Sequence, residues 1–271
     1  MKKVVLFIAG VLLFVVGVWL LAIPAGLVQG LIEDSRGRNG IYLKAEGLEK
    51  GLFYSIHIEK VLLKKKGFED PLMVFDDIHA GIDVASLLRL SPEIEFGCLL
   101  NGGRVLGDIK LAGRNYLRVR GDSISIDGIP FLELIGIRGK GSLSGNFWLK
   151  DKVGEMRFSI SDMKLRSTVF PPKDLGKFLG VSFSGSVPLP LDLFDSIKGE
   201  ILVNDGITDV KSFGMEGFGV YARVKGDIRE GNMNMKMEVM TDSSFKSEHL
   251  LEMMLRQYMV SPGYYLIPLM I

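Results

Sequence analysis

The chain has 271 residues, enough for one large domain or two small ones. Its 33 Lys and Arg nearly balance 32 Asp and Glu, and this formal net charge of +1 excludes nucleic acid as an expected partner, because phosphate binding needs a basic excess. The single cysteine, Cys98, cannot form an internal disulfide, so a domain outside the cytoplasm would be held together by packing alone, with Cys98 as a small buried apolar residue.

The N-terminal region predicts a membrane anchor. Residues Val4–Val28 form a run of 25 residues without a charge, about 37 Å of helix against about 30 Å of bilayer hydrocarbon. This run is too long for a cleaved signal peptide. Because Lys2 and Lys3 precede it, the positive-inside rule places the N-terminus in the cytoplasm. We therefore predict that residues 1–30 form a cytoplasmic tip and one transmembrane helix, and that residues 31–271 form a β domain outside the cytoplasm.

Beyond residue 40, apolar and polar residues alternate with a period of two, which is typical of strands with one buried face. Short turn sequences separate these runs and predict hairpins, namely Asn101-Gly102-Gly103, Asp127-Gly128, Asp205-Gly206 and Glu230-Gly231-Asn232. The expected fold class is mainly β, an antiparallel meander with few short helices. The best helical pattern lies near the C-terminus, where Leu255 and Tyr258 share an apolar face. The last segment, Tyr264–Ile271, is too apolar for a frayed tail, so it predicts a final strand docked in the sheet or against a partner.

Glycine is unusually frequent, with 33 residues, and it recurs inside the predicted strands. In a loose four-residue repeat, glycine is followed by Asp, Glu or Asn and then by an apolar residue. The repeat occurs at Leu106–Ile109, Ser144–Phe147, Lys198–Ile201 and Lys225–Ile228. Glycine within a strand marks a bulge, a bend or a close backbone approach. We therefore expect a strongly twisted and curved sheet, and a half-tube is one form that it could take.

The sequence contains no recognisable catalytic motif. The three histidines, His57, His79 and His249, are scattered among unlike elements without metal-ligand spacing, so we expect surface histidines and no metal site. Asp76 and Asp77 are adjacent in a predicted strand and should point to opposite faces. The glycine-rich segment at residues 139–145 runs into a strand instead of opening a helix, which argues against a nucleotide loop. We therefore predict a protein that is not an enzyme and that has no cofactor.

Several segments resemble the type II secretion system protein N family and the wider group of AsmA-like periplasmic β-proteins. The resemblance follows the single N-terminal span and rests on Gly51–Ile58 (GLFYSIHI), Ile94–Phe96 (IEF), Gly103–Ile109 (GRVLGDI), Ser142–Gly145 (SLSG), Gly217–Ala222 (GFGVYA) and Gly263–Leu269 (GYYLIPL). It implies an inner-membrane protein with its bulk in the periplasm, a curved antiparallel sheet, and an association with the machinery that exports folded proteins.

Two functions follow as expectations. The first is an accessory or scaffolding subunit of a type II secretion system that contacts other envelope proteins. The second is a periplasmic lipid-binding or lipid-transfer module of the AsmA-like type, in which one apolar face forms a groove. The residues expected to line this groove are Leu117, Val119, Ile124, Ile126, Phe158, Ile160, Val220, Val224, Met233, Met235 and Met237. The alternative for these residues is an ordinary closed core.

Overall fold

The computed structural model describes residues 17, 19, 23–33, 40–52, 54–83, 86, 89, 91–110, 116–134, 137–166, 169–170, 189–229, 232–245, 253 and 255–270. The helical elements are α2 (Ala25–Glu33), α4 (Pro130–Leu134) and the 3-10 turn η2 (Leu191–Leu193). The strands are β1 (Ile41–Lys50), β2 (Ile56–Lys65), β3 (Met73–Ile82), β4 (Glu93–Leu100), β5 (Gly103–Lys110), β6 (Tyr116–Ser125), β7 (Gly139–Lys150), β8 (Val153–Leu165), β9 (Val169–Phe170), β10 (Leu189–Pro190), β11 (Ser196–Asn204), β12 (Ile207–Gly217), β13 (Val220–Arg229), β14 (Asn232–Thr241), β15 (Met259–Ser261) and β16 (Tyr264–Met270).

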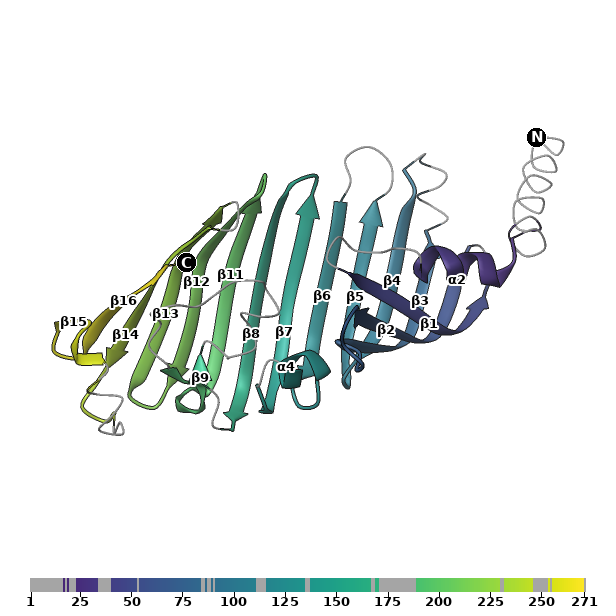
Figure 1. The fold of residues 1–271 in the computed structure, drawn as a ribbon. Helices are drawn as coiled ribbons and strands as arrows, with labels where there is room; N and C mark the ends of the chain where they lie inside the picture. The colour runs from purple at the N-terminus through teal and green to yellow at the C-terminus, as the bar shows by residue number, and fades with distance from the viewer. Residues whose placement is uncertain are drawn as a thin grey trace. The chain divides into compact units, whose positions relative to one another are not determined.

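Over the described ranges, fourteen strands form one antiparallel open sheet, and β9 and β10 form a separate pair (Figure 1). The order in the sheet is β1-β2-β3-β4-β5-β6-β7-β8-β11-β12-β13-β14-β16-β15, so most strands pair with their neighbours in sequence. This confirms the predicted mainly β class with few short helices. The half-tube form stays a prediction.

In the described part of the chain, no helix is long and apolar enough to cross a membrane. Most of the predicted span Val4–Val28 lies outside the described residues, and its last four residues belong to α2. The transmembrane anchor therefore stays a prediction.

The chain divides into two compact units. The first comprises Met1–Leu100 and Arg104–Tyr116, and the second comprises Asn101–Gly103 and Leu117–Ile271.

The core of the first unit shows an irregularity that runs across three strands. Its buried and half-buried members lie three residues apart, as Ala45 and Leu48 on β1, Ile58 and Val61 on β2, and Phe75 and Ile78 on β3. In a regular strand, two residues three positions apart point to opposite faces. Two consecutive residues between them must therefore share the other face on each strand. On β3 this change coincides with a β-bulge against β4 between Asp76 and His79, and the φ angles of Gly47 (70°) and Asp77 (53°) are positive.

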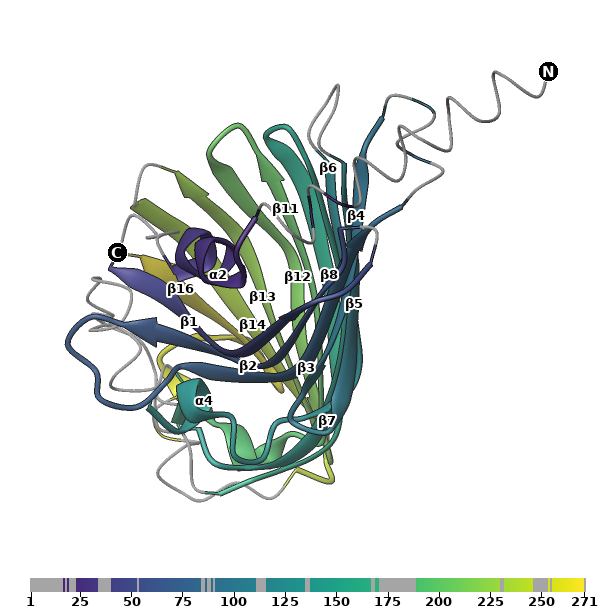
Figure 2. The ribbon, with the colours of Figure 1, turned by 90° about the vertical axis from the view of Figure 1, so that its right-hand side faces the viewer.

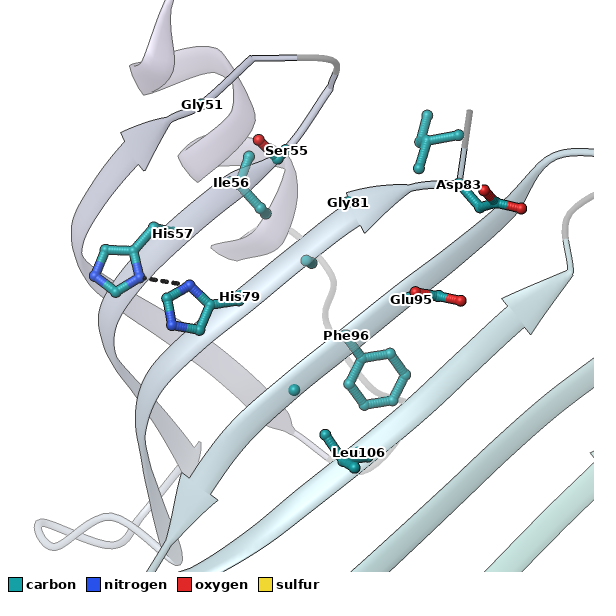
Figure 3. A pocket seen from close by; sticks show the side chains of 13 residues that line it. Gly51, Ser55, Ile56, His57, His79, Gly81, Asp83, Glu95, Phe96 and Leu106 are labelled. Atoms are coloured by element: carbon teal, nitrogen blue, oxygen red, sulfur yellow. Dashed lines mark hydrogen bonds between the residues drawn. The ribbon is translucent and has the colours of Figure 1, made fainter. Parts of the chain in front are cut away.

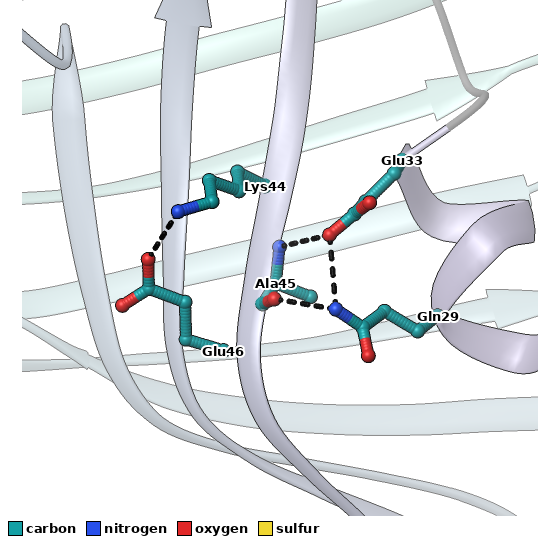
Figure 4. Close-up of polar contacts among 5 residues, drawn as sticks. All are labelled: Gln29, Glu33, Lys44, Ala45 and Glu46. Carbon is teal, nitrogen blue, oxygen red and sulfur yellow. Dashed lines mark hydrogen bonds and ion pairs between the residues drawn. The ribbon is translucent and has the colours of Figure 1, made fainter. Parts of the chain in front are cut away.

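The edge of β1 is covered by α2. The amide of Gln29 donates to the carbonyl of Ala45 at 2.9 Å, and the backbone N–H of Ala45 donates to the carboxylate of Glu33 at 3.3 Å (Figure 4). The N–H and the carbonyl of Ala45 point away from β2. The side chains of Glu33 and Gln29 thus satisfy both groups with hydrogen bonds. Further toward the N-terminus, the indole N–H of Trp19 donates to the carbonyl of Gly51 at 2.9 Å, and the Trp19 side chain is buried.

In the second unit, β11 to β14 follow one another as a meander (Figure 2). The register aligns apolar residues in rows that cross the strands from β7 to β16 on one face, which we call the apolar face. The first row is Leu143, Ile160, Ile197, Met215, Ala222, Val239 and Tyr265. The second row is Gly145, Phe158, Gly199, Phe213, Val224, Met237 and Ile267.

Two of the four predicted hairpin turns are confirmed in full. Glu230 and Gly231 of a third lie outside the described residues, although the strands on either side of them pair with each other. Asn101-Gly102 joins β4 to β5, and Asp205-Gly206 joins β11 to β12, with positive φ at all four residues as this type of hairpin requires. The prediction of a hairpin at Asp127-Gly128 is wrong, because this turn leads into α4 and not directly into a strand. The apolar C-terminal segment is docked in the sheet, since β16 pairs with β14.

Candidate functional site

On β12 to β16, the first two rows of the apolar face belong to a packed core. Met215, Ala222, Met237, Val239 and Ile267 are fully buried. They share one hydrophobic cluster with Leu191 of η2 and with Phe194, Leu255 and the half-buried Leu132 of α4. These segments cover the sheet at this end. Most of the predicted C-terminal helix lies outside the described residues, but Leu255 and Tyr258 do belong to this cluster, as their apolar pattern suggests.

The residues predicted to line a groove fall into three groups. Ile126, Val220, Val224 and Met237 are buried members of the cluster, so at these four positions the apolar face is packed core and not open groove. Phe158, Ile160 and Met235 are half-buried and pack against the same cluster. Ile124 is buried outside it, Leu117 and Val119 are half-buried, and the side chain of Met233 lies outside the described residues.

The apolar face continues past this covered end in two further rows. The third row aligns Phe147, Met156 and Ile201 across β7, β8 and β11, and the fourth aligns Leu149, Gly154 and Val203. Met156 has 36% of its surface exposed, and Phe147, Leu149, Ile201 and Val203 are half-buried. We call these two rows on β7, β8 and β11 the open rows. Sequence reasoning missed them, although Phe147, Leu149, Ile201 and Val203 continue the same alternation.

The opposite face of the strands in the second unit is polar and carries cross-strand ion pairs. The guanidinium of Arg223 on β13 binds the carboxylate of Glu238 on β14 through two nitrogens, one of them at 2.9 Å. This contact holds the pKa of Glu238 below its ordinary value and raises that of Arg223. Because charged side chains occupy one face and apolar side chains the other, a ligand with an apolar surface would bind to the apolar face.

A pocket of about 380 Å³ lies near the ends of β6, β7 and β8. Its lining includes Arg138, Lys140, Lys164 and Arg166, against the two acidic residues Asp127 and Glu133. The register sets Lys140 directly opposite Lys164. This pocket also includes Ile126 of the covered cluster, so it adjoins the closed end of the apolar face and not the open rows.

The last strands of the second unit carry exposed apolar side chains. Met259 and Val260 of β15 are 52% and 63% exposed, and Leu266 of β16 is 37% exposed. We call these three residues the edge patch; it has members on both faces of the sheet, because Met259 is opposite Tyr265 of the apolar face and Leu266 is opposite Glu238 of the polar face. β15 pairs with β16 only near Tyr264 and Tyr265, and no described strand pairs with the outer edge of β16 from Ile267 to Leu269.

The first unit contains a pocket of about 510 Å³ whose lining includes His57, His79, Glu95, Phe96 and Leu106 (Figure 3). The prediction that the histidines are scattered is wrong for two of them. His57 on β2 and His79 on β3 are direct partners in the register, and their Nδ1 atoms lie 3.0 Å apart. The sequence does contain an Asp-x-His spacing at Asp77 and His79. Only the register of β3 with β2, however, shows that His57 lies beside them.

The prediction that Asp76 and Asp77 point to opposite faces is also wrong. The bulge places both on the polar face, where Asp76 lies 3.8 Å from the ammonium of Lys60 and Asp77 lies 3.0 Å from Nε2 of His79. On the neighbouring strand, Cys98 is half-buried, and burial raises the pKa of its thiol above the ordinary value. It therefore behaves as a poorly reactive thiol.

Comparison with family models, curated proteins and solved structures yields no match for this chain.

Proposed function

We propose that this chain is a non-enzymatic accessory subunit of a type II secretion assembly, anchored in the inner membrane by residues 1–30 with residues 31–271 in the periplasm. In this role the sheet acts as a scaffold for other envelope proteins. The observation that supports this role is that the two edges of the sheet differ in how their backbone groups are covered.

The edge at β1 is covered by α2, whereas among the described residues no strand covers the end of β16 beyond the short β15. Gln29 and Glu33 of α2 bind both outward backbone groups of Ala45, which blocks the addition of a further strand there. On β16, the stretch from Ile267 to Leu269 has only β14 as a described neighbour. An open edge beside exposed apolar side chains is the arrangement to which an extended segment of a partner adds as a strand.

The chemistry of the edge patch defines the partner. Met259, Val260 and Leu266 are apolar, and Met259 is also flexible in shape, so they suit an extended segment with apolar side chains. Backbone hydrogen bonds along β16 would supply affinity, except from Pro268, which has no N–H to donate, and the patch would supply selectivity. The partner proposed here is such a segment of another envelope protein.

Photo-crosslinking in intact cells tests this proposal. A photoreactive residue at Val260 should give a discrete adduct with another envelope protein. The matched control is Lys44 on β1, whose side chain is 52% exposed but lies on the protected strand and should give none. Equal adducts at both positions, or none at Val260, would contradict the edge as the contact surface. Normal export of all secreted proteins after deletion of the gene would contradict the secretion role.

A second candidate function is phospholipid binding, and the open rows favour it. Phe147, Met156 and Ile201 form an apolar row that stays partly exposed on a face whose other end is closed. Exposed apolar surface of this kind is stabilised by contact with acyl chains. An acyl chain would lie across β7, β8 and β11.

Photo-crosslinking at two adjacent positions on β8 distinguishes phospholipid binding from the scaffold function. A photoreactive residue at Met156 faces the open rows, whereas one at Arg157 lies on the polar face and is 61% exposed at its side chain. Phospholipid adducts from Met156 alone would support lipid binding. Only intramolecular links from Met156 would show that the open rows are covered in the cell, and this would remove the lipid candidate without affecting the test at Val260.

A further inference from the structure

We propose that His57, Asp77 and His79 form a binding site for one divalent transition-metal ion of the Zn²⁺ class. The site lies on the polar face of the first unit, and neither proposed function requires it. These three residues are called the histidine–aspartate cluster below.

The two imidazoles already have the separation of metal ligands. His57 and His79 are opposite each other on β2 and β3, with their ring centroids 4.5 Å apart and their Nδ1 atoms at 3.0 Å (Figure 3). Two nitrogens that are each about 2.1 Å from one ion lie about 3.0–3.4 Å apart at octahedral or tetrahedral angles. The backbone pairing of β2 and β3 thus holds two ligands in place before an ion arrives.

Asp77 supplies the third ligand, and the bulge is what brings it there. Its Oδ1 lies 3.7 Å from Nδ1 of His57 and 3.0 Å from Nε2 of His79, which is not the nitrogen that faces His57. One donor atom from each of the three residues lies within 4.8 Å of the others, so a turn of the carboxylate or of the His79 ring would let all three bind one ion. In a regular strand, Asp77 and Asp76 would point to opposite faces. The φ of Asp77 is positive, at 53°, a conformation that Asp adopts more readily than most residues with a side chain.

The surroundings leave room for an ion and its water ligands. The residue opposite His79 on β4 is Gly97, which has no side chain, and both histidines line the pocket of about 510 Å³. The side chains of His57, Asp77 and His79 are 35%, 53% and 62% exposed, so an ion can reach all three. On β1, the register places Glu49 opposite His57, which adds negative charge to the same face.

The donor set indicates which ions fit. Two imidazoles and one carboxylate suit Zn²⁺, Ni²⁺ or Cu²⁺, whereas Mg²⁺ and Ca²⁺ prefer oxygen ligands. Three protein ligands leave the remaining positions to water. We therefore expect selective binding of Zn²⁺ over Mg²⁺ with one ion per chain.

Metal binding is measured on the full-length chain in detergent without a polyhistidine tag. Equilibrium dialysis should give one Zn²⁺ per chain, unaffected by excess Mg²⁺. Binding of Co²⁺ in place of Zn²⁺ should produce visible absorption from imidazole and carboxylate coordination. Failure of the wild-type chain to bind Zn²⁺ or Co²⁺ would overturn the proposal.

Substitutions assign the ligands. His57→Ala, His79→Ala and Asp77→Asn should each weaken Zn²⁺ binding at least about tenfold. Asp77→Gly accepts the positive φ and removes only the carboxylate, so it separates ligand loss from loss of the bulge. Asp76→Asn, which alters the neighbouring carboxylate near Lys60, and His249→Ala, which alters the third histidine, should bind as the wild type does. Undiminished binding in a double His57→Ala, His79→Ala variant would overturn the assignment.

Discussion

At the scale of single residues, glycines in the second unit make room for large side chains on the next strand. A Cβ on Gly199 would lie 2.2 Å from the ring of Phe158, and one on Gly145 would lie 2.9 Å from the Cβ of Phe158. A Cβ on Gly226 would lie 2.6 Å from the Cα of Met235. These three glycines belong to the loose repeat in the sequence. The structure thus confirms close approach as their role.

Replacement of one of these glycines should therefore destabilise the second unit. In Gly199→Ala, the new methyl group displaces the ring of Phe158 from the second row of the apolar face. We expect a loss of about 1–3 kcal/mol in the free energy of unfolding, measured by urea denaturation. Gly30→Ala in α2 is the control, because a Cβ there meets no atom within 4 Å and alanine favours a helix. An equal effect of both substitutions would contradict this role of Gly199.

The Arg223–Glu238 pair makes stability depend on pH. Arg223 holds the pKa of Glu238 below its ordinary value of 4.5, so the pair stabilises the fold above that pH and the contribution is lost as the pH falls through the lowered pKa. The side chain of Glu238 is only 12% exposed. We expect Glu238→Gln to cost about 1 kcal/mol at pH 7 and progressively less as the pH is lowered toward 2.

Urea denaturation at a series of pH values between 7 and 2 measures this difference. Glu46→Gln is the control, since Glu46 pairs with Lys44 at 2.7 Å on an exposed surface and should change stability less. A difference between wild type and Glu238→Gln that did not depend on pH would contradict the assignment.

At the scale of elements, α2 protects the edge strand β1 through Gln29 and Glu33. Glu33→Ala removes the acceptor of the Ala45 N–H and should expose that backbone group to water. We expect faster amide hydrogen exchange at Ala45 by at least about tenfold, measured by NMR or mass spectrometry. The exchange at Val61 of β2 should stay unchanged, because β2 pairs on both sides. Unchanged exchange at Ala45 would show that α2 does not protect this edge.

At the scale of the whole molecule, the predicted anchor determines on which side of the membrane both units lie. A reporter fused after Ile271 should be active only outside the cytoplasm, because Lys2 and Lys3 precede the apolar run. Moving two lysines from before the run to a position just after Val28 should reduce or reverse this orientation. Alkaline phosphatase and green fluorescent protein fusions measure the two outcomes. Reporter activity in the cytoplasm for the unaltered chain would contradict the proposed location.

The sequence by itself determined the secondary structure of the described chain to a large extent. Alternation with a period of two marks strands wherever one face is apolar, and turn residues such as Asn101-Gly102 and Asp205-Gly206 mark hairpins because few residues accept positive φ. These are local properties, so they can be read without knowledge of neighbouring strands. The apolar composition of Tyr264–Ile271 likewise predicted a docked last strand.

Only the tertiary structure decided which residues meet. His57 and His79 are far apart in sequence, and their contact depends on the register of β2 with β3. The β-bulge that turns Asp77 toward these two histidines leaves no mark on the alternation of apolar and polar residues, so the sequence alone does not predict it. In the same way, Val224 and Met156 both belong to apolar runs, but the segment around Leu191 and Phe194 covers the cluster that contains Val224, while Met156 stays partly exposed. Alternation predicts which side of a strand is apolar, whereas register and the covering segments determine what that side contacts.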